Sequence, residues 1–302
     1  MSSCRHIRKF FEFVKLQGRV EKEAGFSTVL GVHYESLINR PVSFDNEQGL
    51  TVRLPLTSEK LLPLRKSVSL STYLALIDDI TTWALVLGDP NRSRPGKSLS
   101  MRAEWGLSST PKDEVDIVAK VKKIGRNVGF TGAEVRDAGG VVCCASHIKY
   151  LPMGFTTDMA LSSYGWKAAT LYSEYVLSPK SLDNIPLLSE IFDSLTFVSD
   201  MKATFEPSPI HASLGGPIHG GCQAILMELV ATQVAKRELA TNAVELDAIH
   251  VEYMSPPSSR TVELQVNVLP HSESSTMINL NVRLLGEDGR TKSEGVLRYS
   301  KG

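Results

Sequence analysis

The sequence predicts an α+β protein in which one unit of about 150 residues occurs twice. Similar segments recur in the same order in both halves of the 302-residue chain, each half has one long apolar helix, and strands of alternating polarity follow that helix. A chain of this length is too long for one small core and suits two units. We therefore expect an N-terminal repeat at residues 1–151 and a C-terminal repeat at residues 152–302, with the linker inside 152–200.

The repeat is recognised from segments that match at nearly constant spacing. In chain order, the matches are 69–87 over 219–237, 103–105 over 251–253, 115–121 over 262–268, and 147–150 over 296–299. The first match places Asp78 over Glu228, and the last places Tyr150 over Tyr299. Each match is weak alone, but their preserved order is hard to obtain by chance. We interpret the pattern as a tandem duplication.

Each half is predicted to contain a helix with one buried face, because apolar residues recur at steps of three and four. These residues are Tyr73, Leu76, Ile77, Ile80, Trp83, Ala84 and Leu87, and in the second half Leu226, Leu229, Val230 and Val234. The segments 262–268 and 278–284 instead alternate apolar and polar residues. Such alternation is typical of an antiparallel sheet with one face on a core and one in water. One helix followed by a meander of strands predicts a sheet that wraps the helix.

The composition gives no support for a nucleic-acid partner or a membrane surface. The 33 Lys and Arg residues balance the 33 Asp and Glu residues, so no net field would attract either. No apolar run approaches the roughly 18 residues that a membrane span needs. We therefore expect a soluble protein without a membrane span, whose partners are small molecules or proteins.

The four cysteines indicate neither a metal site nor a disulfide framework. Cys143 and Cys144 are adjacent, and Cys4 and Cys222 lie far from them, so no zinc-ligand spacing occurs. This pattern fits a reducing compartment, and we expect a cytoplasmic protein that uses no metal and no cofactor.

The first eleven residues are basic, with no acid before Glu12. A mitochondrial presequence is therefore an alternative, although further acids soon follow. The other interpretation is an amphipathic N-terminal helix whose apolar face consists of Phe10, Phe11, Val14 and Leu16.

A family resemblance rests on three consecutive features of the second half. The segment 215–221 reads Gly-Gly-Pro-Ile-His-Gly-Gly, a buried helix with an acid at Glu228 follows, and 253–256 reads Tyr-Met-Ser-Pro. This series resembles the small acyl-CoA thioesterases of the hotdog superfamily. The first half is similar through its helix with Asp78 and through the strands that follow Lys122.

The resemblance implies a double hotdog, with two long central helices packed on one continuous antiparallel sheet. It implies metal-independent hydrolysis of an acyl-CoA or acyl-carrier-protein thioester to a carboxylic acid and a free thiol. Because family members usually build each site from two subunits, the two halves of this chain would take the place of the two subunits. It also implies further assembly into a homo-oligomer.

The two halves retain different parts of the family site. Compared with the family, the second half has the better helix start, at Ser213, His219 and Gly220. The first half keeps an aspartate and its companions, at Asp78, Thr82 and Ser98. We therefore expect one composite site in which these two groups face each other. Gly216 and Gly221 are expected to bind substrate, and the opposite pairing, Glu228 facing Leu70 and Pro63, is expected to be poor or inactive.

The residue types suit thioester hydrolysis. Unpaired N–H groups at a helix start can bind an oxyanion, and Gly220 would allow a carbonyl to approach that backbone. A facing carboxylate can act as a general base on water or attack the carbonyl itself, and the sequence leaves both routes open. We interpret Asp78 as the acid, with Glu228 as the alternative, and Asp79 as a solvated helix residue. His219 is expected to act through its backbone turn more than through its imidazole.

Two other functions remain open at this point. The segment 206–211 reads Glu-Pro-Ser-Pro-Ile-His and resembles the signature of hotdog enoyl-CoA hydratases, although Glu206 and Ser208 depart from that signature. The third hypothesis is a non-catalytic acyl-CoA binder, because the first half has already lost its His-Gly-Gly motif and a fold alone does not settle function.

Overall fold

The computed structural model describes most of the chain. The described residues are 2–20, 25–45, 47, 49–62, 67–89, 94–106, 113–153, 165, 168, 171–172, 184–213, 217–257, 260–272 and 275–302.

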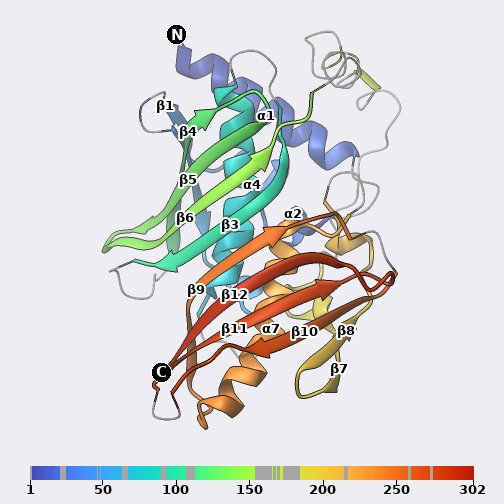
Figure 1. Ribbon diagram of the computed structural model, residues 1–302. Helices are drawn as coiled ribbons and strands as arrows, with labels where there is room; N and C mark the ends of the chain where they lie inside the picture. The colour runs from blue at the N-terminus through green and yellow to red at the C-terminus, as the bar shows by residue number, and fades with distance from the viewer. Residues whose placement is uncertain are drawn as a thin grey trace.

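One sheet of twelve strands runs through both halves of the chain (Figure 1). The first half supplies β1 (Val42–Asp45), β2 (Gly49–Pro55), β3 (Lys97–Trp105), β4 (Glu114–Ile124), β5 (Val128–Asp137) and β6 (Gly140–Tyr150). The second half supplies β7 (Thr196–Ser199), β8 (Lys202–Phe205), β9 (Val244–Tyr253), β10 (Val262–Val268), β11 (Met277–Leu285) and β12 (Thr291–Lys301).

The strand order shows that the two halves are built alike. It runs β1-β2-β4-β5-β6-β3-β9-β12-β11-β10-β8-β7, so the order on one side of the β3–β9 junction mirrors the order on the other. The junction is itself an antiparallel pair, with Met101 opposite Val251 and Ala103 opposite Ile249. The predicted continuous antiparallel sheet is confirmed.

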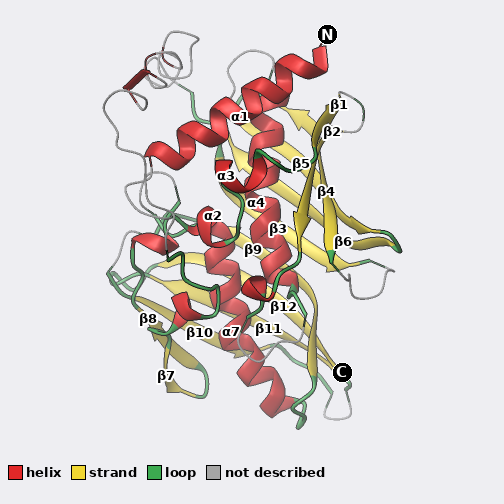
Figure 2. Ribbon diagram, turned by 180° about the vertical axis from the view of Figure 1, so that it is seen from behind, coloured by secondary structure: helices red, strands yellow, loops and turns green. Residues whose placement is uncertain are grey.

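Two long helices pack side by side on one face of this sheet (Figure 2). They are α4 (Leu70–Gly88) and α7 (Gly220–Glu238), each of 19 residues and each directly before the long strands of its half. The side chain of Ser69 caps α4 by accepting a hydrogen bond from the amide of Thr72. The predicted α+β architecture with two central helices is therefore confirmed.

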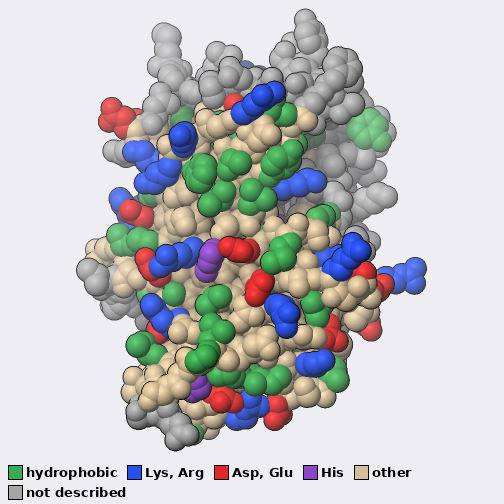
Figure 3. Space-filling model, viewed as in Figure 1, with side chains coloured by type: hydrophobic (Ala, Val, Ile, Leu, Met, Phe, Trp, Pro, Cys, Tyr) green, Lys and Arg blue, Asp and Glu red, His purple; other side chains and the backbone are tan. Residues whose placement is uncertain are grey.

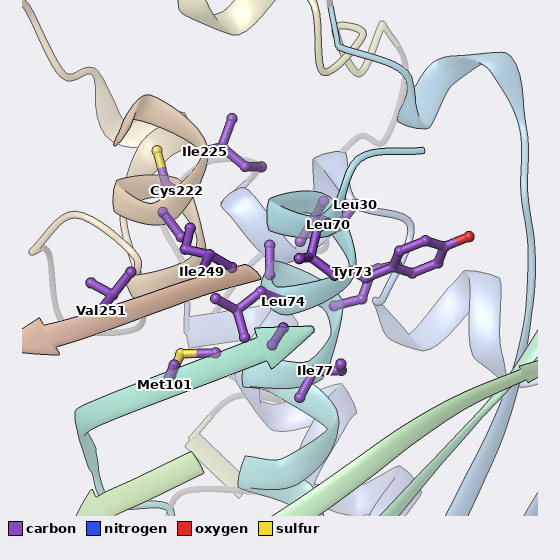
Figure 4. Packing of buried hydrophobic residues seen from close by; sticks show 14 of the residues in the cluster. Leu30, Leu70, Tyr73, Leu74, Ile77, Met101, Cys222, Ile225, Ile249 and Val251 are labelled. Atoms are coloured by element: carbon purple, nitrogen blue, oxygen red, sulfur yellow. The ribbon is translucent and has the colours of Figure 1, made fainter. Parts of the chain in front are cut away.

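The halves share a single hydrophobic core at their junction (Figure 4). Leu74 and Ile77 of α4, Met101 of β3, Ile225 of α7 and Ile249 of β9 are all fully buried there. Burying a large aliphatic side chain stabilises a fold by about 1.5–3 kcal/mol, so this shared cluster holds the two halves in one register.

The helix α4 is long and apolar enough to cross a membrane, by length and composition only. Its 18-residue window has a mean hydropathy of 1.3, and 94% of that window is buried inside the protein. The expectation that no apolar run approaches the length of a membrane span was therefore wrong for 70–88. The helix is buried because the sheet, α7 and the N-terminal helix cover it on several sides.

That N-terminal helix, α1 (Ser2–Val20), is amphipathic as the second interpretation of the N-terminus predicted. Phe10 and Val14 are buried, and the Phe10 ring meets the Trp83 ring of α4 edge-on, with their centroids 5.2 Å apart. The short helices α2 (Phe26–Val29) and α3 (Tyr34–Leu37) continue this layer beside α4.

The described residues also include three single turns of 3-10 helix, Ser58–Lys60, Glu190–Phe192 and Pro209–His211. The outer face of the sheet carries charged side chains of both signs interspersed with hydrophobic ones (Figure 3).

The sequence alignment of the last strands was wrong by one residue. Lys149 of β6 lies opposite Ser98, whereas Tyr299 of β12 lies opposite Leu246. Since Ser98 and Leu246 correspond in the two repeats, the counterpart of Tyr299 is Lys149 and not Tyr150. A slip of one residue reverses the two faces of a strand. Accordingly Tyr150 is 39% exposed, while Lys149 and Tyr299 point into the interior.

Candidate active site

A cavity of about 340 Å³ opens where the first half meets the start of α7. Its wall includes residues of α4, β3 and β6 from the first half, residues of α7 and β9 from the second half, and Phe13 from α1. Six predicted site residues line it, namely Asp78, Thr82, Ser98, Ser213, His219 and Gly220. The two groups that the sequence predicted to face each other therefore share one cavity.

Asp78 carries the carboxylate of this site, and its residue is only 4% exposed. Its Oδ1 accepts hydrogen bonds from Ser98 Oγ at 3.1 Å and from Lys149 Nζ at 3.2 Å. Its Oδ2 points toward the start of α7, where a Cβ added to Gly220 would lie 2.8 Å from it. One oxygen is thus held by the first half, and the other faces the second half.

Lys149 and His147 belong to the site, although the sequence analysis did not select them. Both project inward from β6, two residues apart on the same face of the strand. The His147 Nε2 lies 2.9 Å from Ser98 Oγ, and Lys149 Nζ donates to Thr82 Oγ1 at 2.6 Å. The sequence signal was a charged residue at an inward position of a strand, which the slipped alignment hid.

The charges around Asp78 decide its ionisation. Burial raises the pKa of Asp78, but the charge of Lys149, the neighbouring histidines and the hydrogen bond from Lys149 more than offset this, so the pKa lies well below the usual range for an aspartate. Burial and the neighbouring Lys149 lower the pKa of His147 to about 3, so its imidazole is neutral at physiological pH. Asp78 is therefore ionised at physiological pH.

His219 caps α7 with its imidazole. Its Nδ1 accepts a hydrogen bond from the amide of Gly221 at 3.0 Å, which places the ring proton on Nε2. That Nε2 lies 3.3 Å from Asp79 Oδ1, and Nδ1 lies 3.6 Å from Asp78 Oδ2. The imidazole thus shapes the helix start, a larger role than the sequence analysis gave it.

Asp79 is not the solvated residue that the sequence analysis expected. It is 5% exposed, lines the cavity and faces His219. Burial lowers the pKa of His219. The negative charges of Asp79, which has the larger effect of the two, and of Asp78 outweigh burial, so the pKa is raised overall. The expectation failed because α7 packs against α4 and covers the turn of α4 that contains Asp79.

Gly220 is the first residue of α7, so its N–H has no partner within the helix. Tyr253 holds this turn from β9, donating its hydroxyl hydrogen to the Gly220 carbonyl at 2.9 Å. Burial raises the pKa of Tyr253 well above its usual value, so the phenol keeps the proton that it donates. A polar N–H at the positive end of a helix is a suitable place for an oxyanion.

Ser213 lies at the rim of the same cavity. Its Oγ donates to the Pro217 carbonyl at 3.2 Å, and its amide donates to the same oxygen at 2.8 Å. The serine therefore closes the loop that leads into α7. Gly216, predicted to bind substrate, and Pro63 lie outside the described residues.

Gly221, also predicted to bind substrate, does not line the cavity. A Cβ at this position would lie 2.5 Å from both Cα and Cβ of Ala75. Its amide is already bonded to His219. The glycine is therefore required for the contact between α7 and Ala75 of α4, a packing constraint that the sequence pattern does not separate from substrate binding.

Gly221→Ala is expected to destabilise the protein. The new methyl group would overlap the backbone of α4, which cannot move away as a flexible side chain could. Overpacking of this kind costs about 1–3 kcal/mol, and more where backbone must shift. Thermal denaturation measures the effect, with Ala75→Gly in the same chain as the compensating change. Recovery of part of the lost melting temperature in the double variant is expected, and no recovery would contradict this packing account.

Glu228 lies in the mirror-image position but does not line the cavity that holds Asp78. It is 1% exposed, and its carboxylate accepts a short hydrogen bond from the hydroxyl of Ser71. Ser71 is the counterpart of Gly221. A side chain of α4 therefore bonds to Glu228, whereas the equivalent glycine of α7 has no side chain that could bond to Asp78. The Tyr299 hydroxyl, the counterpart of the Lys149 ammonium, donates instead to the Glu228 carbonyl at 3.2 Å. The protein's own side chains fill this second position.

His211, the histidine of the hydratase-like segment, has a structural environment. Its Nε2 lies 2.5 Å from the Ile191 carbonyl oxygen, and its ring packs edge-on against Phe205, with their centroids 4.8 Å apart. It does not line the cavity. Across the residues that the structure describes, no group of three or more His, Cys, Asp and Glu residues could hold a metal ion.

Comparison with known proteins adds information on the fold. No protein-family model matches the sequence, and no curated protein matches it significantly. Among solved structures, the TesB protein of Mycobacterium avium subspecies paratuberculosis superposes with a TM-score of 0.58 at 9% identity, covering 92% of this chain and 99% of its own. The chain has a double hotdog fold.

A second solved structure gives the same result. The 12:0-ACP thioesterase of Umbellularia californica has a TM-score of 0.56 at 13% identity, covering 83% of this chain and 94% of its own. At such identities the likeness concerns the double hotdog fold alone. The resemblance to hotdog thioesterases that the sequence suggested is confirmed at that level.

Proposed function

We propose that this double hotdog protein hydrolyses an acyl thioester, at one composite site between its halves. The observation that supports the proposal most is the position of Asp78, whose Oδ2 faces Gly220 across a cavity shared by both halves. A carboxylate and an unpaired helix N–H on opposite sides of one cavity are the two groups that thioester hydrolysis needs.

In the general-base route, a water molecule lies between Asp78 Oδ2 and the thioester carbonyl. Its oxygen bonds to the carbonyl carbon while its proton moves to Oδ2. The π electrons move to the carbonyl oxygen, which the Gly220 N–H stabilises. When the carbon–sulfur bond breaks, the electrons return to form the acid, and the thiolate takes the proton from Asp78.

In the nucleophilic route, Asp78 Oδ2 itself bonds to the carbonyl carbon and the thiolate leaves. Water then hydrolyses the resulting anhydride and restores the carboxylate. Both routes begin from an ionised Asp78, as its lowered pKa favours. Single turnover in ¹⁸O-labelled water tests the nucleophilic route, because the label enters Asp78 only if water attacks the Asp78 carbonyl carbon of the anhydride.

The substrate class proposed is an acyl-CoA or an acyl-carrier-protein thioester. Of the residues that line the cavity, Phe13 and Gln223 are buried, whereas Lys97, Leu99 and Met254 are exposed. We place the acyl group beside the buried residues and the pantetheine arm beside the exposed ones. The scissile carbonyl would then lie at Gly220.

A panel of acyl-CoA and acyl-carrier-protein thioesters, with detection of the free thiol, tests the proposal. Thiol release by the wild-type protein is expected for at least one acyl group. Saturable binding of the panel without thiol release would contradict hydrolysis and favour a binding protein. Hydration of an enoyl-CoA without thiol release would favour the hydratase alternative.

A further inference from the structure

Lys149 is a buried cation in the wall of the cavity, and the hydrolytic routes above give it no part. Its side chain is 4% exposed. Its Nζ donates to Thr82 Oγ1 at 2.6 Å, to Asp78 Oδ1 at 3.2 Å and to Ser98 Oγ at 3.3 Å. An ammonium group has three N–H bonds, so all three are engaged within the protein and none remains for a substrate.

These contacts determine which oxygen of Asp78 faces the cavity. Lys149 and Ser98 both hold Oδ1. Ser98 gives its only hydroxyl hydrogen to Asp78, so His147 Nε2, 2.9 Å from Ser98 Oγ, is the donor in that contact. These hydrogen bonds run from His147 of β6 through Ser98 of β3 to Asp78 of α4, and they leave Oδ2 directed at Gly220.

The mirror-image half has no such cation. The counterparts of Ser98, His147 and Lys149 are Leu246, Leu297 and Tyr299, and all three are buried. The same strand positions therefore fold well with apolar and aromatic side chains. Of the two halves, only the one whose acid, Asp78, lines the cavity has polar side chains at these three positions. This difference argues for a role in chemistry rather than in folding.

We propose that Lys149 is a positioning residue for the hydrolysis, fixing Oδ1 of Asp78, directing Oδ2 at Gly220 and keeping the buried carboxylate charged. The inference rests on the proposed function, because positioning has a purpose only if Asp78 reacts. Lys149 itself touches neither substrate nor reacting atoms in this arrangement.

The electrostatic surroundings of Asp78 give the expected direction of change. Lys149 and His147 face it from β6, His219 from α7, Tyr253 from β9, and Asp79 follows it on α4. Burial raises the pKa of Asp78, and the charge of Lys149 is the largest effect that lowers it. Removing that charge must therefore raise the pKa and move the acid limb of the pH–rate profile to higher pH.

The kinetic experiment measures kcat/KM against pH for the wild-type protein, Lys149→Met and Lys149→Gln. Lys120→Met, an exposed lysine on β4, is the matched control. We expect the acid limb of the pH–rate profile to move to higher pH by about one to three units in both Lys149 variants, the usual effect of removing one nearby opposite charge. A loss of orientation should also lower the plateau by up to about 100-fold. An unchanged limb in folded variants would overturn the inference.

A second measurement does not depend on turnover. The carboxyl carbon of Asp78 is titrated by ¹³C NMR in the substrate-free protein and assigned by its absence in Asp78→Asn. The midpoint is expected below the usual aspartate range in the wild-type protein and higher in Lys149→Gln. A wild-type midpoint at or above the usual range would overturn the inference even if no variant folds. The expected midpoints without hydrolysis of any thioester would show that Lys149 keeps Asp78 ionised but would reject the hydrolase, and with it the positioning role.

Discussion

Asp78→Asn is expected to lower kcat/KM for thioester hydrolysis by a factor of roughly 10² to 10⁴, the usual contribution of a positioned acid–base group. The amide cannot take a proton from water or attack the carbonyl, yet its oxygen can still accept the hydrogen bonds of Lys149 and Ser98. The fold should therefore survive while the chemistry is lost. Free-thiol release measures the rate, and thermal denaturation verifies the fold.

Glu228→Gln is the informative comparison, because Glu228 occupies the equivalent position in the other half. Its carboxylate is already bonded to Ser71 and does not line the cavity that holds Asp78. We expect hydrolysis close to the wild-type rate, since the amide oxygen of Gln can still accept the hydrogen bond from Ser71. A large loss in Glu228→Gln with full activity in Asp78→Asn would reverse the assignment of the two halves.

Gly220→Ala is expected to lower kcat/KM by about 10² to 10³, comparable to the loss of an oxyanion donor. The new Cβ would lie 2.8 Å from Asp78 Oδ2 and 3.3 Å from the Tyr253 ring. Asp78 cannot turn away without breaking its bonds to Lys149 and Ser98. The methyl group would therefore occupy the position between the acid and the helix start, where the carbonyl must come.

Gly125→Ala is the control for an added methyl group. Gly125 lies in the turn between β4 and β5, and the nearest atom to its new Cβ is the Val128 carbonyl oxygen at 3.2 Å. Activity close to wild type is expected there. If Gly220→Ala also hydrolyses thioesters at the wild-type rate, the carbonyl does not approach Gly220 and the proposed position of the substrate is wrong.

Much of the fold could be predicted from the sequence because the duplication repeats every signal. The apolar steps in 70–88 and 220–238 indicated two central helices, and the alternation in 262–268 and 278–284 indicated an antiparallel sheet. Comparing the two halves also indicated which parts of the site had been kept. Asp78 and Gly220 were paired on that ground, and they line the same cavity.

Other parts of the site depend on register and packing, which the sequence does not specify. The matching tyrosines at 150 and 299 favoured an alignment that is wrong by one residue, and this hid Lys149. The sequence suggested a solvated Asp79, because the residues that bury it, at the N-terminal end of α7, belong to the other half of the chain. Gly221 looked like a ligand-binding glycine, although what requires it is contact with Ala75.

A crystal structure with a non-hydrolysable acyl-CoA analogue, in which a methylene separates sulfur and carbonyl, tests the composite site most directly. The account predicts one analogue per chain, with its carbonyl oxygen within hydrogen-bonding distance of the Gly220 N–H and its carbonyl carbon facing Asp78 Oδ2. An analogue bound at Glu228, or bound with its carbonyl away from both groups, would contradict it.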